Sequence, residues 1–494
     1  MPYVDILSAN DHASLWYITN TPSGNASDFD PSKPTVIMLH PFCFDSSWLG
    51  NQLSDPRLGP NYNMIAFDSR VAGRSRTRLS GKLDHWVETA DLAFACQILH
   101  LPPAHLWAEE SLATNVALRF AILFPEMCLS LALITVAPPT ELSTVFTSLD
   151  ELMRLWGFAE DLEGLEHANK ELLGLTVGYD IDAEEIDEIV AYWQRTYPPF
   201  KRSRFMMLGN LLTNRVPLKT AFLANIRQPV MLLHGESNAL HPLRFAEELK
   251  EQLCNAVGGV NLCVIKGSAG FLSVIPSCAS ILNKFFVKFL ARLPHARSDL
   301  RPPAIPINER MKSALVNLAQ MYDDQSIASR DPRSPMSFSL VPPSVEKLQT
   351  DALRLYARDE RKAFSPLSSD GRPIRKYSER KDGHWFSSDS GGMSFAGKIR
   401  KPSCGLTFTD NALWWLGGTD FSLLNVGSMP NSSSSPRTRS VAPGGPEPVT
   451  LDMIQDSRVR RATFNPHGID KLVVQGSLSR VSMSTGIPVG KFLS

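Results

Sequence analysis

A single serine stands between a short apolar run and a helical segment in the stretch Leu106–Phe120, LWAEESLATNVALRF. The apolar residues before the serine have the length of a buried strand, and the spacing after it is typical of a helix. A strand-to-helix turn lifts a side chain above the end of a sheet, where binding and catalytic groups gather. Ser111 is therefore our first candidate for a reacting residue.

Short apolar runs alternate with longer helical segments on both sides of this stretch, from about Thr35 to Leu290. This alternation is typical of a parallel sheet covered by helices. The runs expected as strands are Thr35–Leu39, Met64–Phe67, Leu131–Val136, Val230–Leu233 and Leu262–Ile265. Parallel strands end at one edge of a sheet, so we expect an α/β fold with its binding residues in the loops at that edge.

A long helical stretch separates the third of these runs from the fourth. At about 90 residues it far exceeds an ordinary crossover, so it predicts a helical cap inserted into the sheet. We predict a core made of residues 1–142 and 225–294, with the cap at residues 143–224. The many apolar side chains of the cap favour an apolar ligand, although a helical insertion must also bury a core of its own.

The last 200 residues differ in composition from the rest of the chain. Residues 1–294 carry 23 Lys and Arg against 31 Asp and Glu, whereas residues 295–494 carry 27 against 19. Of the 36 prolines, 17 lie in the second part. We predict a basic, Pro/Ser-rich and partly disordered extension over residues 295–494, with amphipathic helices at Asn308–Tyr322 and Ser344–Arg358.

The composition of the whole chain excludes several classes of protein. Its 494 residues include 50 basic and 50 acidic side chains, a balance that argues against a surface built to grip nucleic acid or an anionic membrane. The 7 cysteines are unclustered, which predicts reduced thiols in the cytoplasm. We expect no cofactor, no metal and no membrane span. The basic run Arg372–Lys381 leaves an acidic partner open.

Three segments resemble the α/β-hydrolase superfamily, and the resemblance covers about residues 3–293. Ser111 stands where that family has its nucleophile, Asp68–Ser75 resembles its Asp-x-Arg-x-x-Gly-x-Ser loop, and His40-Pro41-Phe42 stands at its oxyanion segment. The resemblance implies an α/β-hydrolase fold, with a mostly parallel sheet flanked by helices and a helical cap. It also implies hydrolysis of a C–O or C–N bond by a serine nucleophile without a cofactor.

Other residue types stand where the family has its catalytic acid and histidine. Asn238 matches the acid position in Gly235–Pro242, and Gly270 matches the histidine position in Lys266–Ser273. A serine nucleophile needs a base to take its proton and an acid to orient that base. Replacement of both partners predicts a weak or inactive hydrolase, which would be a pseudoenzyme that still binds a ligand.

The alternative is an active carboxylic-ester or lactone hydrolase in which Ser111 has a substitute base. His40 ends the strand before the oxyanion segment and is the first candidate, unless it only shapes that loop by hydrogen bonds. His241, at the mouth of the sheet, is a further candidate base, unless it lies in a solvated loop. Glu141 stands where some members of the family supply their acid, and it would need a histidine to orient. Glu110, directly before Ser111, could bind a cation or an amine, or it could point to solvent.

An oxyanion hole is compatible with the sequence, because it needs backbone N–H groups rather than particular side chains. Pro41 has no N–H, so Phe42 and Leu112 are the expected donors. Together with a helix N-terminus, these donors favour a small apolar ligand that is ester-like or contains a carboxylate.

Overall fold

A mixed sheet forms the centre of the computed structural model, which describes residues 2–178, 181–238 and 240–380. Within these residues the strand order is β1-β2-β4-β3-β6-β7-β8-β9, with β5 beside β2. The pairs from β4 to β9 are parallel, whereas β2 is antiparallel to each of its neighbours. The strands are Tyr3–Leu7 (β1), His12–Thr19 (β2), Thr35–Leu39 (β3), Asn63–Phe67 (β4), Arg76–Thr77 (β5), Ala104–Glu109 (β6), Cys128–Ile134 (β7), Val230–Gly235 (β8) and Val260–Ile265 (β9). All five apolar runs singled out in the sequence form strands, which confirms the mostly parallel sheet.

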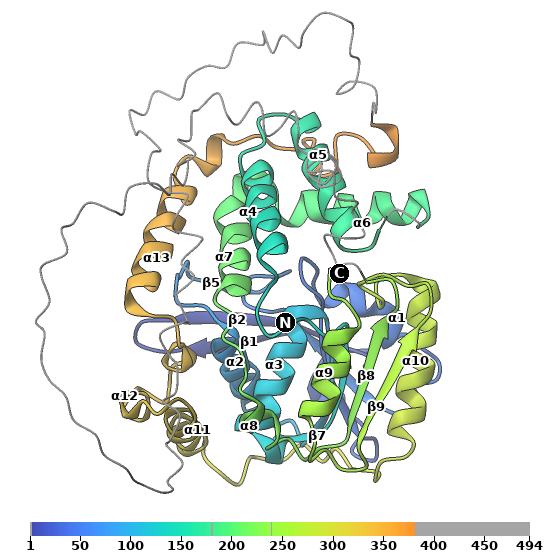
Figure 1. Cartoon of the computed structure of the whole chain (residues 1–494), viewed down its shortest axis with the longest axis vertical. Coiled ribbons are helices and arrows are strands. Elements are labelled where there is room, and N and C mark those ends of the chain that lie inside the picture. The colour runs from blue at the N-terminus through green and yellow to red at the C-terminus, as the bar shows by residue number, and fades with distance from the viewer. Residues whose placement is uncertain (1, 179–180, 239, 381–494) are drawn as a thin grey trace, which may run out of the picture. The chain divides into compact units, whose positions relative to one another are not determined.

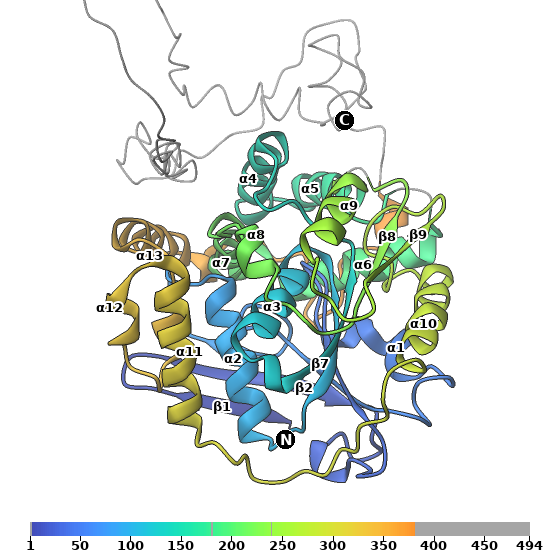
Figure 2. The same ribbon diagram turned by 60° about the horizontal axis from the view of Figure 1, so that its bottom comes forward.

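Helices cover both faces of this sheet (Figures 1 and 2). The side chains of Ile37, Leu106 and Leu131 pack in one core with the helices on the first face. Those of Val36, Trp107 and Ala132 pack in a second core on the opposite face. The helices of the first face include α2 (His85–Ile98), α3 (Glu110–Leu123), α9 (Arg244–Gln252) and α11 (Ile307–Tyr322); α1 (Gly50–Leu53) and α10 (Pro276–Leu290) lie on the second.

A group of helices is inserted between β7 and β8, and we call it the cap. Its helices are α4 (Ser143–Gly157), α5 (Leu162–Leu175), α6 (Ala183–Thr196), α7 (Arg202–Thr213) and the short α8 (Thr220–Leu223). Figure 1 shows α4 to α7 together, beyond the ends of the strands. Buried tryptophans hold the cap helices to one another, since Trp156 of α4 and Trp193 of α6 meet edge to face at 6.0 Å. The cap therefore has a core of its own.

The chain continues as an ordered, docked segment beyond the last sheet helix. Its elements are α11, α12 (Gln325–Ala328), α13 (Pro343–Ala357) and three short 3-10 helices, Pro335–Phe338, Glu360–Lys362 and Tyr377–Glu379. Leu315, Leu318 and Phe338 are fully buried in the core of the first face. The two helices expected in the extension are thus present and packed. Residues 381–494, the rest of the extension that we predicted to be partly disordered, lie outside the described residues.

The described part of the chain has neither a membrane-spanning helix nor a cluster of metal-binding side chains. No helix there is long and apolar enough to cross a membrane. No group of three or more His, Cys, Asp or Glu side chains in the same residues could hold a metal ion. The six cysteines that the structure describes are all free thiols.

The loop Asp68–Ser75 after β4 is held together by its own polar groups. The Asp68 carboxylate accepts hydrogen bonds from the backbone of Ser46, at 2.9 Å, and of Arg74, at 2.8 Å. Gly73 has φ +48°, and a Cβ there would lie only 2.1 Å from Oδ2 of Asp68. The glycine is therefore required both by the backbone conformation and by the close approach of Asp68.

Arg70 of this loop joins three distant parts of the core. Its guanidinium binds the carboxylate of Asp11 at 2.7 Å and also that of Asp91 on α2. The Arg70 side chain is fully buried, and those of Asp11 and Asp91 are 4% and 5% exposed. Two buried carboxylates on one guanidinium are stable only as a set, because loss of the cation would leave them uncompensated.

Glu109, the last residue of β6, is also completely buried. Its Oε1 accepts a hydrogen bond of 2.9 Å from the backbone N–H of Ser273. Burial raises the pKa of Glu109 to about 7, although the hydrogen bonds from Ser273 oppose this rise. A large side chain fits at this turn because it lies toward Ser273, in the loop before α10.

Replacing Arg70 by Met should lower the free energy of unfolding by about 3–5 kcal/mol, because Asp11 and Asp91 would stay buried without a cation. Urea unfolding followed by circular dichroism measures this change. The matched control is Arg354→Met, since Arg354 pairs with Asp351 at the surface and is 74% exposed. Its effect should stay within about 0.5 kcal/mol. Equal effects of the two substitutions would contradict the role given to Arg70.

The buried Glu109 should make stability fall as the pH rises. Its folded-state pKa of about 7 lies above the ordinary 4.5, so its favourable contribution is complete below about pH 4.5 and is lost as the pH rises through 7. Glu109→Gln removes this pH-dependent contribution to the free energy of unfolding. Between about pH 5 and pH 9, the free energy of unfolding of the variant should therefore rise by up to about 3 kcal/mol relative to that of the wild type. A pH-independent difference would mean that Glu109 titrates normally.

Candidate active site

The residue at the turn from β6 to α3 is Glu110, with φ +69°. A left-handed backbone is costly for a residue other than glycine, and such strain persists where the surrounding structure holds it. Ser111, which we expected at this turn, lies one residue further on, in the first turn of α3. In this type of turn, small residues stand two positions before and after the residue at the turn. Ala108 is the small residue two positions before Glu110.

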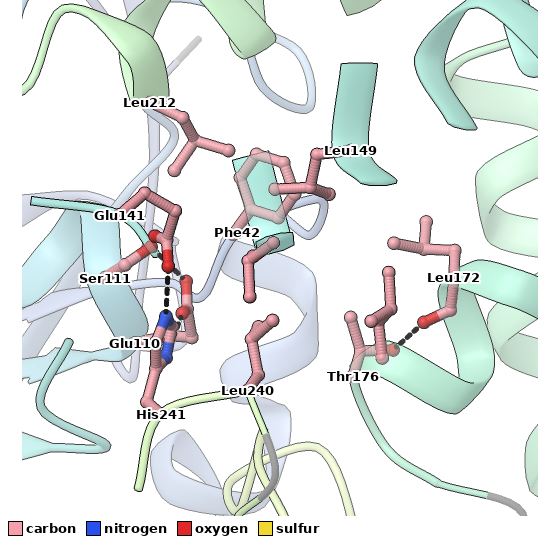
Figure 3. A pocket seen from close by; sticks show the side chains of 12 residues that line it. Phe42, Glu110, Ser111, Glu141, Leu149, Leu172, Thr176, Leu212, Leu240 and His241 are labelled. Atoms are coloured by element: carbon pink, nitrogen blue, oxygen red, sulfur yellow. Dashed lines mark hydrogen bonds and ion pairs between the residues drawn. The ribbon is translucent and has the colours of Figure 1, made fainter. Parts of the chain in front are cut away.

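Five side chains form a continuous buried chain of polar contacts, which we call the relay, and Figure 3 shows four of them, Ser111, Glu110, His241 and Glu141. Ser111 Oγ donates a 2.8 Å hydrogen bond to Oε2 of Glu110. Oε1 of Glu110 lies 3.2 Å from Nδ1 of His241, and Nε2 of His241 lies 3.6 Å from Oε1 of Glu141. Oε2 of Glu141 accepts a 2.9 Å hydrogen bond from Nη2 of Arg215. Each carboxylate thus joins two neighbours through its two oxygens.

Burial and charge set the protonation of the two carboxylates. Burial raises the pKa of Glu110 above its ordinary value, although His241 and the hydrogen bonds from Ser111 oppose the rise. Burial would also raise the pKa of Glu141, but the hydrogen bond and charge of His241 and the charge of Arg215 outweigh it and hold that pKa at about 2. Glu141 is therefore ionised at neutral pH, and Glu110 is the carboxylate of the relay whose protonation changes more readily.

His241 does not lie in a solvated loop, since it is 1% exposed and both its backbone N–H and its backbone carbonyl oxygen are hydrogen-bonded. Its N–H donates a 2.8 Å hydrogen bond to Oδ1 of Asn238. Its carbonyl oxygen accepts a 2.8 Å hydrogen bond from Nε2 of His234, whose Nδ1 accepts the N–H of Val136 at 3.3 Å. His234 therefore ties the loop after β8 to the loop that leads from β7 to Glu141.

Asn238 and Gly270 lie beside each other, as the resemblance implies for an acid and a histidine. A Cβ added to Gly270 would lie 3.3 Å from Nδ2 of Asn238 and 3.1 Å from the carbonyl oxygen of Thr176 in the cap. Even one carbon atom is tight at this position, so an imidazole would require the cap to shift. The histidine of this site comes instead from the loop after β8, as His241.

His40 has both ring nitrogens occupied. Nδ1 lies 2.9 Å from the carbonyl oxygen of Pro41, and Nε2 accepts a 3.0 Å hydrogen bond from the backbone N–H of Ser69. A carbonyl only accepts and an amide N–H only donates, so His40 is neutral with its proton on Nδ1. Its hydrogen bonds shape the loop, and neither nitrogen is available as a base for Ser111.

The two expected oxyanion donors lie in different surroundings. Phe42 lines the same cavity as Glu110 and Ser111. Leu112 is buried in the first turn of α3 and does not line the cavity. Ser111, one residue before Leu112, lines the cavity instead.

The cavity beside the relay has a volume of only about 20 Å³. Figure 3 shows the polar side chains at one side, with apolar side chains of the cap facing them. The apolar lining includes Phe42, Val145, Leu149, Leu172, Leu212 and Leu240. A volume of this size holds about one water molecule. Any larger ligand therefore requires the cap to move.

Glu110, His241 and Glu141 contact one another in the fold, an arrangement that the sequence did not predict. The sequence carried half of a signal for Glu110, since the small Ala108 stands two positions before it, whereas Leu112, two positions after it, is large. His241 and Glu141 carried no comparable signal, because they lie in loops after different strands and meet only in the fold.

No family model matches this sequence, and neither does any curated protein sequence. Solved structures similar to this chain include an esterase from Rhodococcus sp. ECU1013, with 17% identity, a TM-score of 0.47, and coverage of 60% of this chain and 100% of that one. An enol-lactonase from Burkholderia xenovorans LB400 has 13% identity and a TM-score of 0.47, with coverage of 59% and 100%. A bromoperoxidase from Bacillus anthracis has 15% identity and a TM-score of 0.46, with coverage of 58% and 99%.

The fold itself is evident from the path of the chain. A parallel sheet is preceded by antiparallel strands, a strained turn joins the central strand β6 to α3, and a cap follows β7. This arrangement is the one that the resemblance implies. The chain has the fold of the α/β-hydrolase superfamily.

Proposed function

We propose that this protein is a slow hydrolase of apolar carboxylic esters or lactones, with Ser111 as nucleophile and Glu110 as its base. The observation that carries the proposal is the 2.8 Å hydrogen bond from Ser111 Oγ to Glu110 Oε2, at the start of the relay. A nucleophile, a base at hydrogen-bond distance and a group that orients the base are the parts that covalent catalysis requires. His241 supplies the third part, 3.2 Å from the other oxygen of Glu110.

The reaction consists of two transfers of the same kind. Ser111 Oγ attacks the carbonyl carbon while its proton passes to Glu110, and the tetrahedral adduct expels the alcohol, which takes that proton. A water molecule then attacks the acyl-serine ester, again giving its proton to Glu110. The acid product leaves, and the proton returns from Glu110 to Ser111 Oγ.

Burial suits Glu110 to this role. A general base works best when its pKa lies near the working pH, and burial moves the pKa of Glu110 in that direction. Glu141 stays ionised, so it can compensate positive charge on His241 while Glu110 gains and loses its proton. The oxyanion would be stabilised by backbone N–H groups near Phe42 and at the start of α3.

The proposed rate is low for two reasons. Ser111 has a carboxylate rather than an imidazole as base, and the loss of triad partners costs about 10⁴ in rate in a serine hydrolase. The cavity of about 20 Å³ also means that the cap opens before a substrate enters. Oxyanion and binding effects alone would still leave about 10³ over water.

The charges of the site favour a neutral ligand. Glu110 and Glu141 both line the cavity, and the remaining lining is largely apolar. A ligand carboxylate would be placed beside one or two buried carboxylates, which is unfavourable at low dielectric constant. Of the two ligand classes expected from the sequence, the ester-like one therefore fits better than the carboxylate.

Ligand binding without turnover is the second candidate. It is supported by the small cavity and by Asn238 and Gly270, which stand at the positions that the resemblance assigns to the acid and the histidine. In that case Glu110 would serve only to hold Ser111 and His241 in place. The cytoplasm is the proposed location for either function, since the described cysteines are free thiols.

Labelling with a fluorophosphonate probe tests the role of Ser111. The wild type should form one adduct, at Ser111, and p-nitrophenyl butyrate should be hydrolysed slowly. Ser111→Ala should abolish both, and Glu110→Gln should lower both by about 10²-fold or more, because it removes the base. The matched control is Ser143→Ala, at the exposed start of α4, which should change neither. Equal labelling of Ser111→Ala and the wild type would refute the proposed nucleophile.

The pH dependence tests the role of Glu110, because the base must be ionised. Turnover should rise with pH and have its midpoint above the ordinary value of 4.5. His241 lowers the pKa of Glu110 and Glu141 raises it. His241→Gln should therefore move the midpoint to higher pH, and Glu141→Gln should move it to lower pH. A midpoint that stays fixed in both variants would assign the titration to another group.

A further inference from the structure

The segment from residue 339 to residue 380, which we call the strap, runs from the core to the cap. At the core its start is held beside the N-terminus of α2. Leu340 N–H donates a 2.7 Å hydrogen bond to Oδ2 of Asp84, and Ser339 Oγ donates one of 2.7 Å to the carbonyl oxygen of Lys82. From there α13 lies along α7 of the cap, as Figure 1 shows.

Polar contacts join the middle of the strap to α7 and the residues around it. Gln349 and Asn214 exchange two hydrogen bonds of 2.9 Å through their side-chain amides. Arg202 donates hydrogen bonds of 2.8 Å and 2.6 Å to the carbonyl oxygens of Tyr356 and Arg358. The strap therefore fixes α7, whose Leu212 lines the cavity beside Ser111.

The end of the strap is held to α5 and α6 by charged contacts, which we call the latch. Arg375 binds the Glu166 carboxylate through two hydrogen bonds of 2.8 Å and 2.5 Å. Ser378 donates from its backbone N–H to Oδ1 of Asp187 and from its hydroxyl to Oδ2, both at 2.7 Å. The sequence left open an acidic partner for the basic run Arg372–Lys381. For Arg375, that partner is Glu166 in the cap of the same chain.

The latch depends mainly on these polar contacts. Ser378 is exposed, and most residues from 358 to 380 are exposed or half-buried, with Tyr377 as the main buried side chain. Segments held by few buried apolar contacts open at low free-energy cost. Ser378 is therefore accessible to an enzyme whenever the end of the strap opens.

The sequence before Ser378 has the charge pattern that some kinases select. Arg375 and Lys376 stand three and two positions before the serine, in Arg375-Lys376-Tyr377-Ser378. Protein kinases discriminate among substrates by such charge patterns around the acceptor hydroxyl. A serine with this pattern whose hydroxyl makes a direct contact to the cap could link a modification to the position of the cap.

We propose that Ser378 is the target of a serine kinase that recognises basic residues, and that its phosphorylation releases the latch. In this step a bond forms between Ser378 Oγ and the γ-phosphorus of ATP while the bond from that phosphorus to the leaving oxygen of ADP breaks. The hydroxyl proton passes to the catalytic carboxylate of the kinase.

The modified side chain cannot keep its contact with α6. It loses the proton that Ser378 Oγ donates to Asp187, and it gains a charge of about −1.5 to −2. That charge would lie against Asp187 and near Glu188, which is exposed on the same helix. Like charges at this distance repel each other, whereas Lys376 and Arg380 offer the phosphate cationic partners within the strap itself.

Phosphorylation of the full-length protein tests the site first. A basic-residue-directed serine kinase with Mg-ATP should modify Ser378, as identified by mass spectrometry, and Ser378→Ala should lose that phosphopeptide. A peptide of residues 372–381 serves as the positive control for the kinase. Phosphorylation of the peptide but not of Ser378 in the full-length protein would overturn the proposal.

Hydrogen–deuterium exchange tests the release of the latch, independently of any hydrolase activity. In Ser378→Glu, backbone amides of residues 363–380 and of α6 should exchange up to about 5-fold faster, the effect of losing one exposed charged contact. Asp187→Arg in addition should restore slow exchange, because the charges then attract. The matched control is Ser368→Glu, since Ser368 is exposed but bonds only within the strap, and it should leave α6 unchanged.

Exchange in Ser378→Glu equal to that of the wild type, or an Asp187→Arg variant that fails to restore it, would refute the latch. Faster labelling of Ser111 by the fluorophosphonate in phosphorylated protein would connect release to opening of the cap. Release of the latch without any labelling of Ser111 would support the latch and count against the proposed hydrolase instead.

Discussion

Two carboxylates on either side of one buried imidazole are the interaction on which the rest of the site depends. Glu110 and Glu141 contact opposite nitrogens of His241, and none of the three has free access to water. Buried charges persist only when they are paired and hydrogen-bonded. Arg215 at one end and Ser111 at the other complete the relay. To place its carboxylate at this turn, Glu110 adopts a strained, left-handed backbone conformation.

The cap excludes water from the relay, and this exclusion of water affects the pKa of the carboxylates in it. Because apolar cap residues close the cavity, burial raises the pKa of Glu110 rather than leaving it an ordinary surface carboxylate. The cap in turn is held by the strap, through Arg202, Arg375 and Ser378. The C-terminal part of the chain thus bears on the chemistry of a site formed by residues far from it in sequence.

Apolar runs such as β3 and amphipathic spacing such as that of α11 were sufficient to predict a parallel sheet covered by helices, whereas the hydrolase fold was predicted from the resemblance of three segments. The candidate site was harder to predict, because the presence of a serine indicated the place of the turn only to within one residue. The turn was predicted at Ser111 but lies at Glu110, for which binding of a cation or an amine and exposure to solvent had both been left open. His241 became a member of the relay only through Asn238 and His234, which fix its loop from two sides. Such contacts between loops leave no periodic signal in a sequence.

The central claim is that Glu110 is a buried carboxylate whose pKa is raised and whose partner is Ser111. Infrared difference spectroscopy tests it most directly, by following the carboxylic acid band of the wild type against Glu110→Gln as the pH is raised. We expect a band that is lost in Glu110→Gln, shifted in Ser111→Ala, and titrated with a midpoint above 4.5. A band that titrates at or below that value, or that is unchanged in Glu110→Gln, would contradict it.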